Sequence, residues 1–248
     1  MLTHRTNLAL ANVEALEQKH GWRITSASGT TLTMTYRNDL QLFFDAASFA
    51  SSNNVTPAAK PRPNAAISLT YIGDDASLHR RPQTLTTQAR FFLQLMRAHL
   101  QCLTQSSTTV PALLSFVSTS WDKTSVISRE VRSLDFSARI DCAIRGDEKL
   151  QVSANVVMPV VGTKMLVDFE VLAAVEGMAL SVKVLPRAKV VYGERYKEDR
   201  MTEFLRGRVP RSINAGAEET GSWADAVNDL RSKLIAQGRK GEAKLRLV

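Results

Sequence analysis

Histidine, the side chain most often used for proton transfer and metal binding, occurs only four times in this chain. The four residues are His4, His20, His79 and His99, and none stands at metal-ligand spacing from a cysteine or a carboxylate. We expect His99 to lie on a helix at the edge of a core. The sequence therefore predicts no metal site and no cofactor.

The two cysteines, Cys102 and Cys142, each lie within an apolar pattern, which favours buried, unpaired thiols. Nothing in their spacing suggests a disulfide framework. We expect Cys102 in the middle of a helix, with no helix N-terminus or basic group beside it to stabilise a thiolate. An activated nucleophile is therefore not indicated.

Asp168 and Glu170 are two residues apart, so in a strand their carboxylates share one face and could act as a pair. An exposed strand face explains them better. Phosphate-binding glycine loops, dinucleotide-binding glycine patterns and a G-x-S-x-G nucleophile turn are absent from the sequence. We therefore predict that the chain is not an enzyme, and a deep pocket with convergent polar groups would revive that class.

The composition is that of a globular protein, with 44% hydrophobic and 23% charged residues in 248. The net charge of +8 fits nucleic acid, an anionic membrane or an acidic protein partner, and solubility alone explains it equally well. No apolar stretch reaches the roughly 18 residues that a membrane span needs. Surface aromatics and nucleic-acid-binding motifs are not evident, so a basic nucleic-acid-binding domain is the alternative rather than the leading hypothesis.

The elements that would position these residues form a repeated pattern. The first twenty residues predict a helix with a weak heptad seam, either one amphipathic helix on a core or, as we favour, the end of a longer coiled coil. A short strand and three strands with alternate apolar residues are expected next. An apolar stripe then predicts a helix over 86–103. Phe92 lies on that stripe and should be core. The strands are expected near 22–26, 32–36, 40–44 and 67–71.

A polar break at 105–110 precedes a second unit of the same kind. We expect a helix near 122–134, four more strands, and a helix that holds Met201 and Leu205. The strands are expected at 140–144, 150–156, 167–171 and 180–184. Residues 208–221 read as a linker, and a short helix near 223–234 could either dock back or extend away. Successive strands joined by tight turns imply antiparallel sheets, which gives an α+β fold.

Several short motifs occur in an order that resembles a known family. They are KHGWRITS at 19–26, LQLFFD at 40–45, YIG at 71–73, RFFLQLMRA at 90–98, EVRSL at 130–134 and VYGE at 191–194. Together they resemble the C-terminal tandem RWD region of the fungal kinetochore scaffold, the large scaffold subunit of the KMN network. The phosphatase and checkpoint-kinase docking repeats of such scaffolds are absent, and the proline-rich turn common in other RWD domains is not obvious.

The resemblance implies four parts: the end of a coiled-coil helix at 1–20, a first RWD domain at 21–107, a second at 108–207, and a C-terminal extension with a short helix at 208–248. It implies a non-catalytic outer-kinetochore module in the nucleus, at the centromere. That module would hold a short peptide from one subunit of the MIND complex. The adjoining coiled coil would bind a Zwint-like partner, and neither a membrane nor nucleic acid is expected to be a partner.

The candidate site is the first strand of the second unit, residues 138–144, which should be a sheet edge. An extended peptide can add to such an edge through backbone hydrogen bonds. Arg139 and Arg145 would pair with acidic side chains of the peptide, and Ile140 would meet an apolar one. Alternatively, the arginines are solvated guards that protect the edge, which fits equally well.

Overall fold

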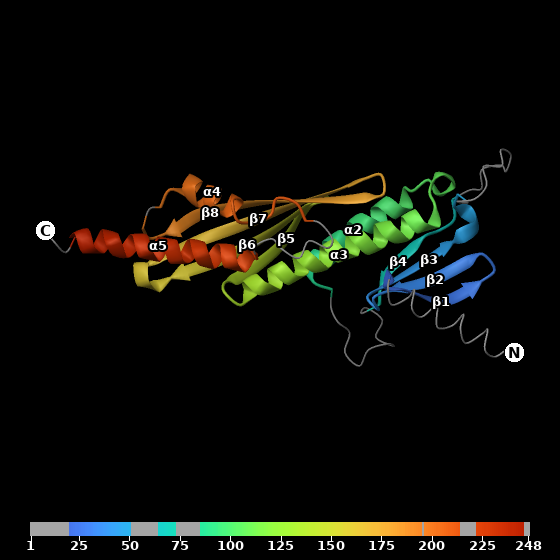
Figure 1. Cartoon of the computed structure of the whole chain (residues 1–248), viewed down its shortest axis with the longest axis horizontal. Coiled ribbons are helices and arrows are strands. Elements are labelled where there is room, and N and C mark those ends of the chain that lie inside the picture. Colours follow the sequence, from blue (N-terminus) through green and yellow to red (C-terminus); the bar gives the residue numbers. More distant parts are fainter. Residues whose placement is uncertain (1–19, 51–63, 73–84, 195, 214–221, 246–248) are drawn as a thin grey trace. The chain divides into compact units, whose positions relative to one another are not determined.

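The computed structural model describes residues 20–50, 64–72, 85–194, 196–213 and 222–245 (Figure 1). The predicted N-terminal helix and its heptad seam lie outside the described residues. Contacts divide the chain into two compact units. The first comprises residues 1–85 and 96–118, and the second comprises residues 86–95 and 119–248. Whether 107/108 is also the limit of an independently folding domain stays a prediction.

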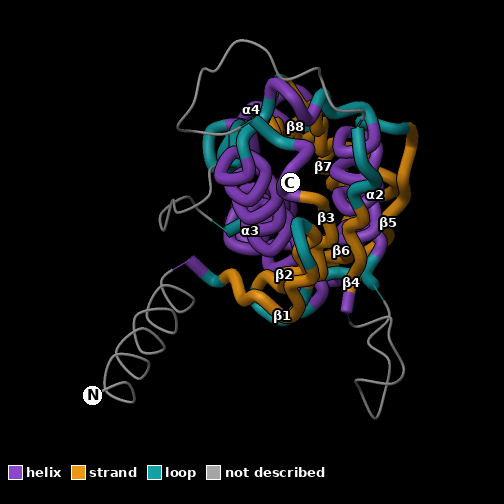
Figure 2. Tube along the Cα trace, turned by 90° about the vertical axis from the view of Figure 1, so that its right-hand side faces the viewer, coloured by secondary structure: helices purple, strands orange, loops and turns teal. Residues whose placement is uncertain are grey.

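The first unit contains a four-stranded antiparallel meander, seen as neighbouring orange strands in Figure 2. Its strands, in the spatial order β1-β2-β3-β4, are β1 (Trp22–Ser28), β2 (Thr31–Tyr36), β3 (Leu40–Asp45) and β4 (Ser68–Tyr71). The turn between β2 and β3 has positive φ at both Arg37 and Asn38, which is the backbone of a tight I′ hairpin. All four strands were predicted, the last three from alternate apolar residues.

One face of this sheet is apolar and packs on helical residues of the same unit. Alternate residues Leu40, Leu42 and Phe44 of β3 are completely buried, whereas Gln41 and Phe43 are exposed. The helical side is supplied by the end of α2 (Thr87–Gln101) and the start of α3 (Val110–Asp135). Its buried side chains are Met96, Leu100, Leu113, Phe116 and Val117.

Helix α3 begins twelve residues before the predicted start at 122. The signal for this earlier start is Thr109-Val110-Pro111. The Ala112 N–H donates to the Thr109 hydroxyl at 3.4 Å, and proline is favoured in the first turn of a helix. The predicted polar break at 105–110 is therefore divided. Its first residues, Gln105–Ser107, form a short 3-10 turn, and its last residue, Val110, begins α3.

The second unit contains a longer meander, again antiparallel and in the order β5-β6-β7-β8. Its strands are β5 (Arg139–Gly146), β6 (Lys149–Met158), β7 (Thr163–Glu176) and β8 (Ala179–Tyr192). Strands β7 and β8 extend well beyond their predicted limits, because alternation of buried and exposed residues continues through both. The α+β class with two antiparallel four-stranded units is confirmed.

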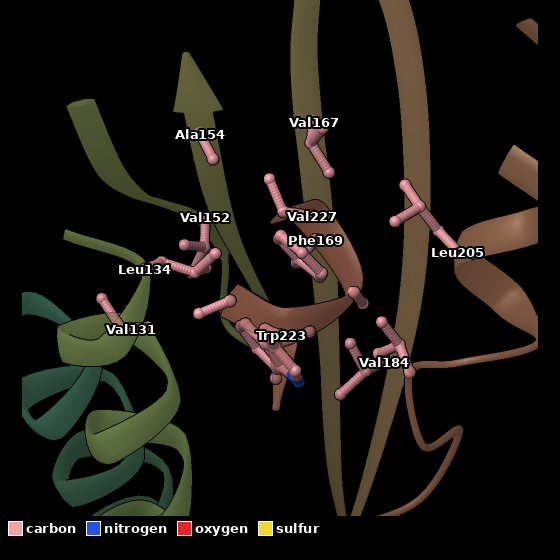
Figure 3. Close-up of a cluster of buried hydrophobic side chains, with 14 of the residues drawn as sticks. Val131, Leu134, Val152, Ala154, Val167, Phe169, Val184, Leu205, Trp223 and Val227 are labelled. Atoms are coloured by element: carbon pink, nitrogen blue, oxygen red, sulfur yellow. The ribbon is translucent and has the colours of Figure 1, made fainter. Parts of the chain in front are cut away.

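Helices of the same unit cover the apolar face of this sheet. They are the beginning of α2, the end of α3, α4 (Glu198–Arg206) and α5 (Trp223–Leu245). Phe92 is completely buried in this core, as predicted. Trp223 is also completely buried, and its ring stacks on Phe169 with the ring centres 4.5 Å apart (Figure 3). A short helix was predicted near 223–234, but α5 is 23 residues long. Its first half packs on the sheet.

The prediction that both cysteines are buried is wrong. Cys102 is exposed and Cys142 is half-buried. Helix α2 ends at Gln101, one residue before Cys102, so this cysteine lies in the following turn rather than in the middle of a helix. Leu100 and Leu103 fill the apolar positions on either side, which leaves the Cys102 side chain on the solvent side.

Candidate functional site

The two edge strands of the second sheet, β5 and β8, differ in what lies outside them. Strand β8 is closed by segments of the same unit, and Pro186 within it has no N–H to offer. Four hydrogen bonds close its outer side. They run from Val184 N–H to the Arg211 carbonyl (3.0 Å), from Ile213 N–H to the Val182 carbonyl (3.2 Å), from Ala188 N–H to Thr202 Oγ1 (3.1 Å) and from Val190 N–H to Glu198 Oε1 (3.1 Å).

Strand β5 pairs only with β6 among the described residues, as the predicted edge of the sheet. Hydrogen bonds outward from β5 are not found within the described part of the chain. Alternate residues along its eight-residue length therefore present unpaired backbone donors and acceptors, which is the requirement for adding an extended peptide.

The three predicted site residues all lie on β5. Arg139 and Arg145 are exposed, and they share the sheet face that points away from the helices. Ile140 is half-buried, because it packs against the edge of the core on the other face. Arg139 and Ile140 therefore point to opposite faces of the sheet, as predicted. Arg145 lies at the other end of β5 from Arg139.

The solvent face beside β5 is a polar network. Arg145 Nε donates to Gln151 Oε1 at 3.0 Å, and Gln151 Nε2 donates to Asp168 at 3.1 Å. The Ser153 hydroxyl also donates to Asp168, at 2.5 Å. Glu170 pairs instead with Lys149 at 2.5 Å. Each of the two carboxylates considered for acid–base chemistry thus has cross-strand partners, and this is the arrangement expected of an exposed strand face.

Two exposed apolar side chains lie beside the open edge. The sequence placed Ile144 on the apolar face of the strand, whereas Phe136 was missed. Phe136 is 90% exposed and lies three residues before β5, while Ile144 near the other end is 38% exposed. The available signal for Phe136 was its position directly after the buried Ile127, Val131 and Leu134 stripe of α3, out of phase with it. An apolar side chain of this size at the edge offers contact area to a partner.

Cys142 is the residue of β5 whose side-chain pKa is clearly shifted. Burial, together with the nearby carboxylates of Asp141 and Asp135, raises the pKa of its thiol to about 11. All three effects disfavour the thiolate. Cys142 is therefore an inert thiol at neutral pH.

The described residues contain no cluster of three or more histidine, cysteine or acidic side chains that could hold a metal ion. In the same part of the chain, each helix is too short or too polar to pass through a bilayer. The features that remain are two helix-covered antiparallel meanders and, in the second sheet, an open edge at β5 with charged and apolar groups beside it. They define a tandem RWD-like α+β protein with a surface suited to protein contacts.

The comparison with protein families identifies this class further. Residues 2–128, slightly more than half of the chain, match the family described as the Knl1 RWD C-terminal domain. The chain belongs to that family and is a C-terminal RWD region of a Knl1-like kinetochore scaffold. A fungal source stays a prediction. The comparison with curated proteins found no similar sequence.

Proposed function

We propose that this chain is a non-catalytic docking module that attaches an outer-kinetochore scaffold to the MIND complex. A short peptide from one MIND subunit adds to β5 as a fifth strand of the second sheet. The module thereby links the centromere to the microtubule-attachment and checkpoint machinery in the nucleus. A Zwint-like protein binds the adjoining coiled coil.

The observation that carries the proposal is the asymmetry of the second sheet. The β8 side is occupied by α4 and by residues 208–213 of the chain itself, whereas β5 has no neighbour beyond β6 in the described structure. An added strand would satisfy the outward backbone groups of β5 and so gain affinity from the main chain. Family membership supports a kinetochore scaffold as the setting.

Side chains near β5 indicate which peptides would fit. Arg139 and Arg145 favour acidic side chains on the solvent face, although Asp141 lies between them and would disfavour an acidic group directly opposite. The exposed part of Ile140 and the Phe136 ring offer apolar contacts at the end of the strand where β5 begins. The peptide should therefore combine acidic and apolar residues in alternation.

The test is a titration of the C-terminal peptide of each MIND subunit against the wild-type chain and Arg139→Glu. A charge reversal at a contact of this kind should weaken binding by about tenfold or more. Lys189→Glu is the matched control, because Lys189 is exposed on β8 of the same sheet, away from the open edge, and the charge change is the same. Thermal melting checks that both variants fold.

Binding of Arg139→Glu within about twofold of wild type would show that the peptide does not use β5. Absence of binding by every MIND peptide would contradict the docking function itself. Titration of plain duplex DNA at low and moderate salt addresses the alternative, since a basic nucleic-acid-binding domain would bind it and lose affinity steeply as salt rises.

A further inference from the structure

A groove separates helices α4 and α5 in the second unit, well away in the fold from strand β5. Its cavity has a volume of about 400 Å³, which is within the range of about 300–1,000 Å³ typical of small ligand sites. Met201, Leu230 and Leu234 are buried and form an apolar floor. The remaining lining residues are Tyr196, Lys197, Arg200, Phe204, Lys233 and Gln237.

The charge of this lining has one sign. The exposed cations are Lys197, directly before α4, Arg200 of α4 and Lys233 of α5, and the lining contains no carboxylate. Lys233 Nζ lies 4.2 Å from the centre of the Phe204 ring, which orients this cation along the groove wall. Ion pairs to these three cations are not found among the described residues.

The walls of the groove are held in place by contacts around it. The Tyr196 hydroxyl lies 2.9 Å from Glu194 Oε2 and 3.1 Å from the Leu234 carbonyl, so it ties the segment before α4 to α5. Burial and the bonded carboxylate raise the pKa of Tyr196 to about 12, so the hydroxyl keeps its proton at neutral pH. Arg208 pairs with Asp229 of α5, so this carboxylate is already engaged by a cation outside the groove.

We propose that this groove is a second docking site, for a short acidic peptide that inserts one apolar side chain. The apolar side chain would enter between Met201 and Leu234, and carboxylates before and after it would face the three cations. The volume suits one or two side chains rather than a whole helix. The lining contains only cations as charged groups, which selects against basic peptides. This site shares no residue with β5, so it is independent of the MIND-peptide proposal.

Fluorescence anisotropy with a labelled peptide GEDFDEG tests the proposal. We expect binding that weakens as salt rises. We expect no comparable binding of GKKFKKG, in which the charge is reversed, or of GEDGDEG, which lacks the apolar side chain. Lys197→Glu combined with Arg200→Glu should reduce affinity by about tenfold or more. Arg206→Glu combined with Lys189→Glu is the matched control, because both of its residues are exposed outside the groove and the net charge change is the same.

Failure of GEDFDEG to bind would overturn the proposal, as would equal binding of GEDGDEG. Equal weakening by the two double variants would show an effect of net charge rather than a site. Displacement of the peptide by sodium phosphate, beyond that caused by sodium chloride of equal ionic strength, would identify a simple anion site instead. Phe204→Ala supplies a second variant without a charge change, and unchanged binding by it would also contradict the groove.

Discussion

The two edges of the second sheet are protected by different means. Strand β8 is covered by other parts of the chain, and its outward N–H groups bond to Arg211, Thr202 and Glu198. Strand β5 is left open and carries charged side chains, among them Arg139 and Arg145. The segments that cover β8 leave no room for an added strand. The charges on β5 disfavour pairing with a second copy of the same edge, but they admit a peptide of opposite charge. The comparison therefore leaves β5 as the open edge of the second sheet, which is where we propose that docking occurs.

The stability of the second unit should depend strongly on Trp223, which lies in its core. Trp223→Ala removes a completely buried ring that stacks on Phe169, so we expect a loss of about 3–5 kcal/mol in the free energy of unfolding. Denaturant melts measure the change. Phe92→Ala, in the same core, should cost a similar amount. A loss below about 1 kcal/mol for Trp223→Ala would mean that α5 does not form part of the core.

The thiol on the open edge should be slow to react. Because the pKa of Cys142 is raised from 9.0 to about 11, its thiolate fraction at pH 8 is roughly a hundredfold below that of an unshifted thiol. Its alkylation rate should therefore still be rising with pH above pH 9. The exposed Cys102 provides the internal comparison in a timed alkylation read by mass spectrometry. Rapid alkylation of Cys142 at pH 7 would contradict the partial burial of this side chain.

The close approach of α5 depends on a glycine. A Cβ on Gly238 would lie 2.7 Å from both Glu194 Oε2 and Val161 Cγ1, so Gly238→Val should destabilise the second unit by about 1–3 kcal/mol. Gly146→Ala at the end of β5 is the comparison, because an added Cβ there meets nothing within 4 Å. Equal melting temperatures for the two variants would show that α5 is not held against residue 161.

Strands β3, β6, β7 and β8 could be predicted from the sequence because each buries one face, so apolar residues alternate along them. Strand β1 has six exposed residues out of seven and carries no such alternation. The apolar stripe of a helix placed Phe92 in the core, and the order of the meander placed β5 at an edge. The early start of α3 was missed because Leu113, Leu114, Phe116 and Val117 were not read together with Thr109 and Pro111. The groove between α4 and α5 was not predictable, since its lining comes from segments about thirty residues apart whose contact depends on how α5 docks.

The smallest effect on stability should come from the open side. Phe136 is 90% exposed, so Phe136→Ala should change the free energy of unfolding by less than about 0.5 kcal/mol. The same variant should weaken binding of the MIND peptide if the ring contacts it. A large loss of stability would show that Phe136 packs within the chain, and would remove it from the docking surface.

Hydrogen exchange of the backbone amides, with and without the MIND-subunit peptide, tests the central claim most directly. An added strand forms new hydrogen bonds to the outward N–H groups of β5, so these amides should exchange more slowly when the peptide is bound. Amides of β8 are already bonded to the chain and should not change. Unchanged exchange on β5 at saturating peptide, or new protection on β8 instead, would contradict the account.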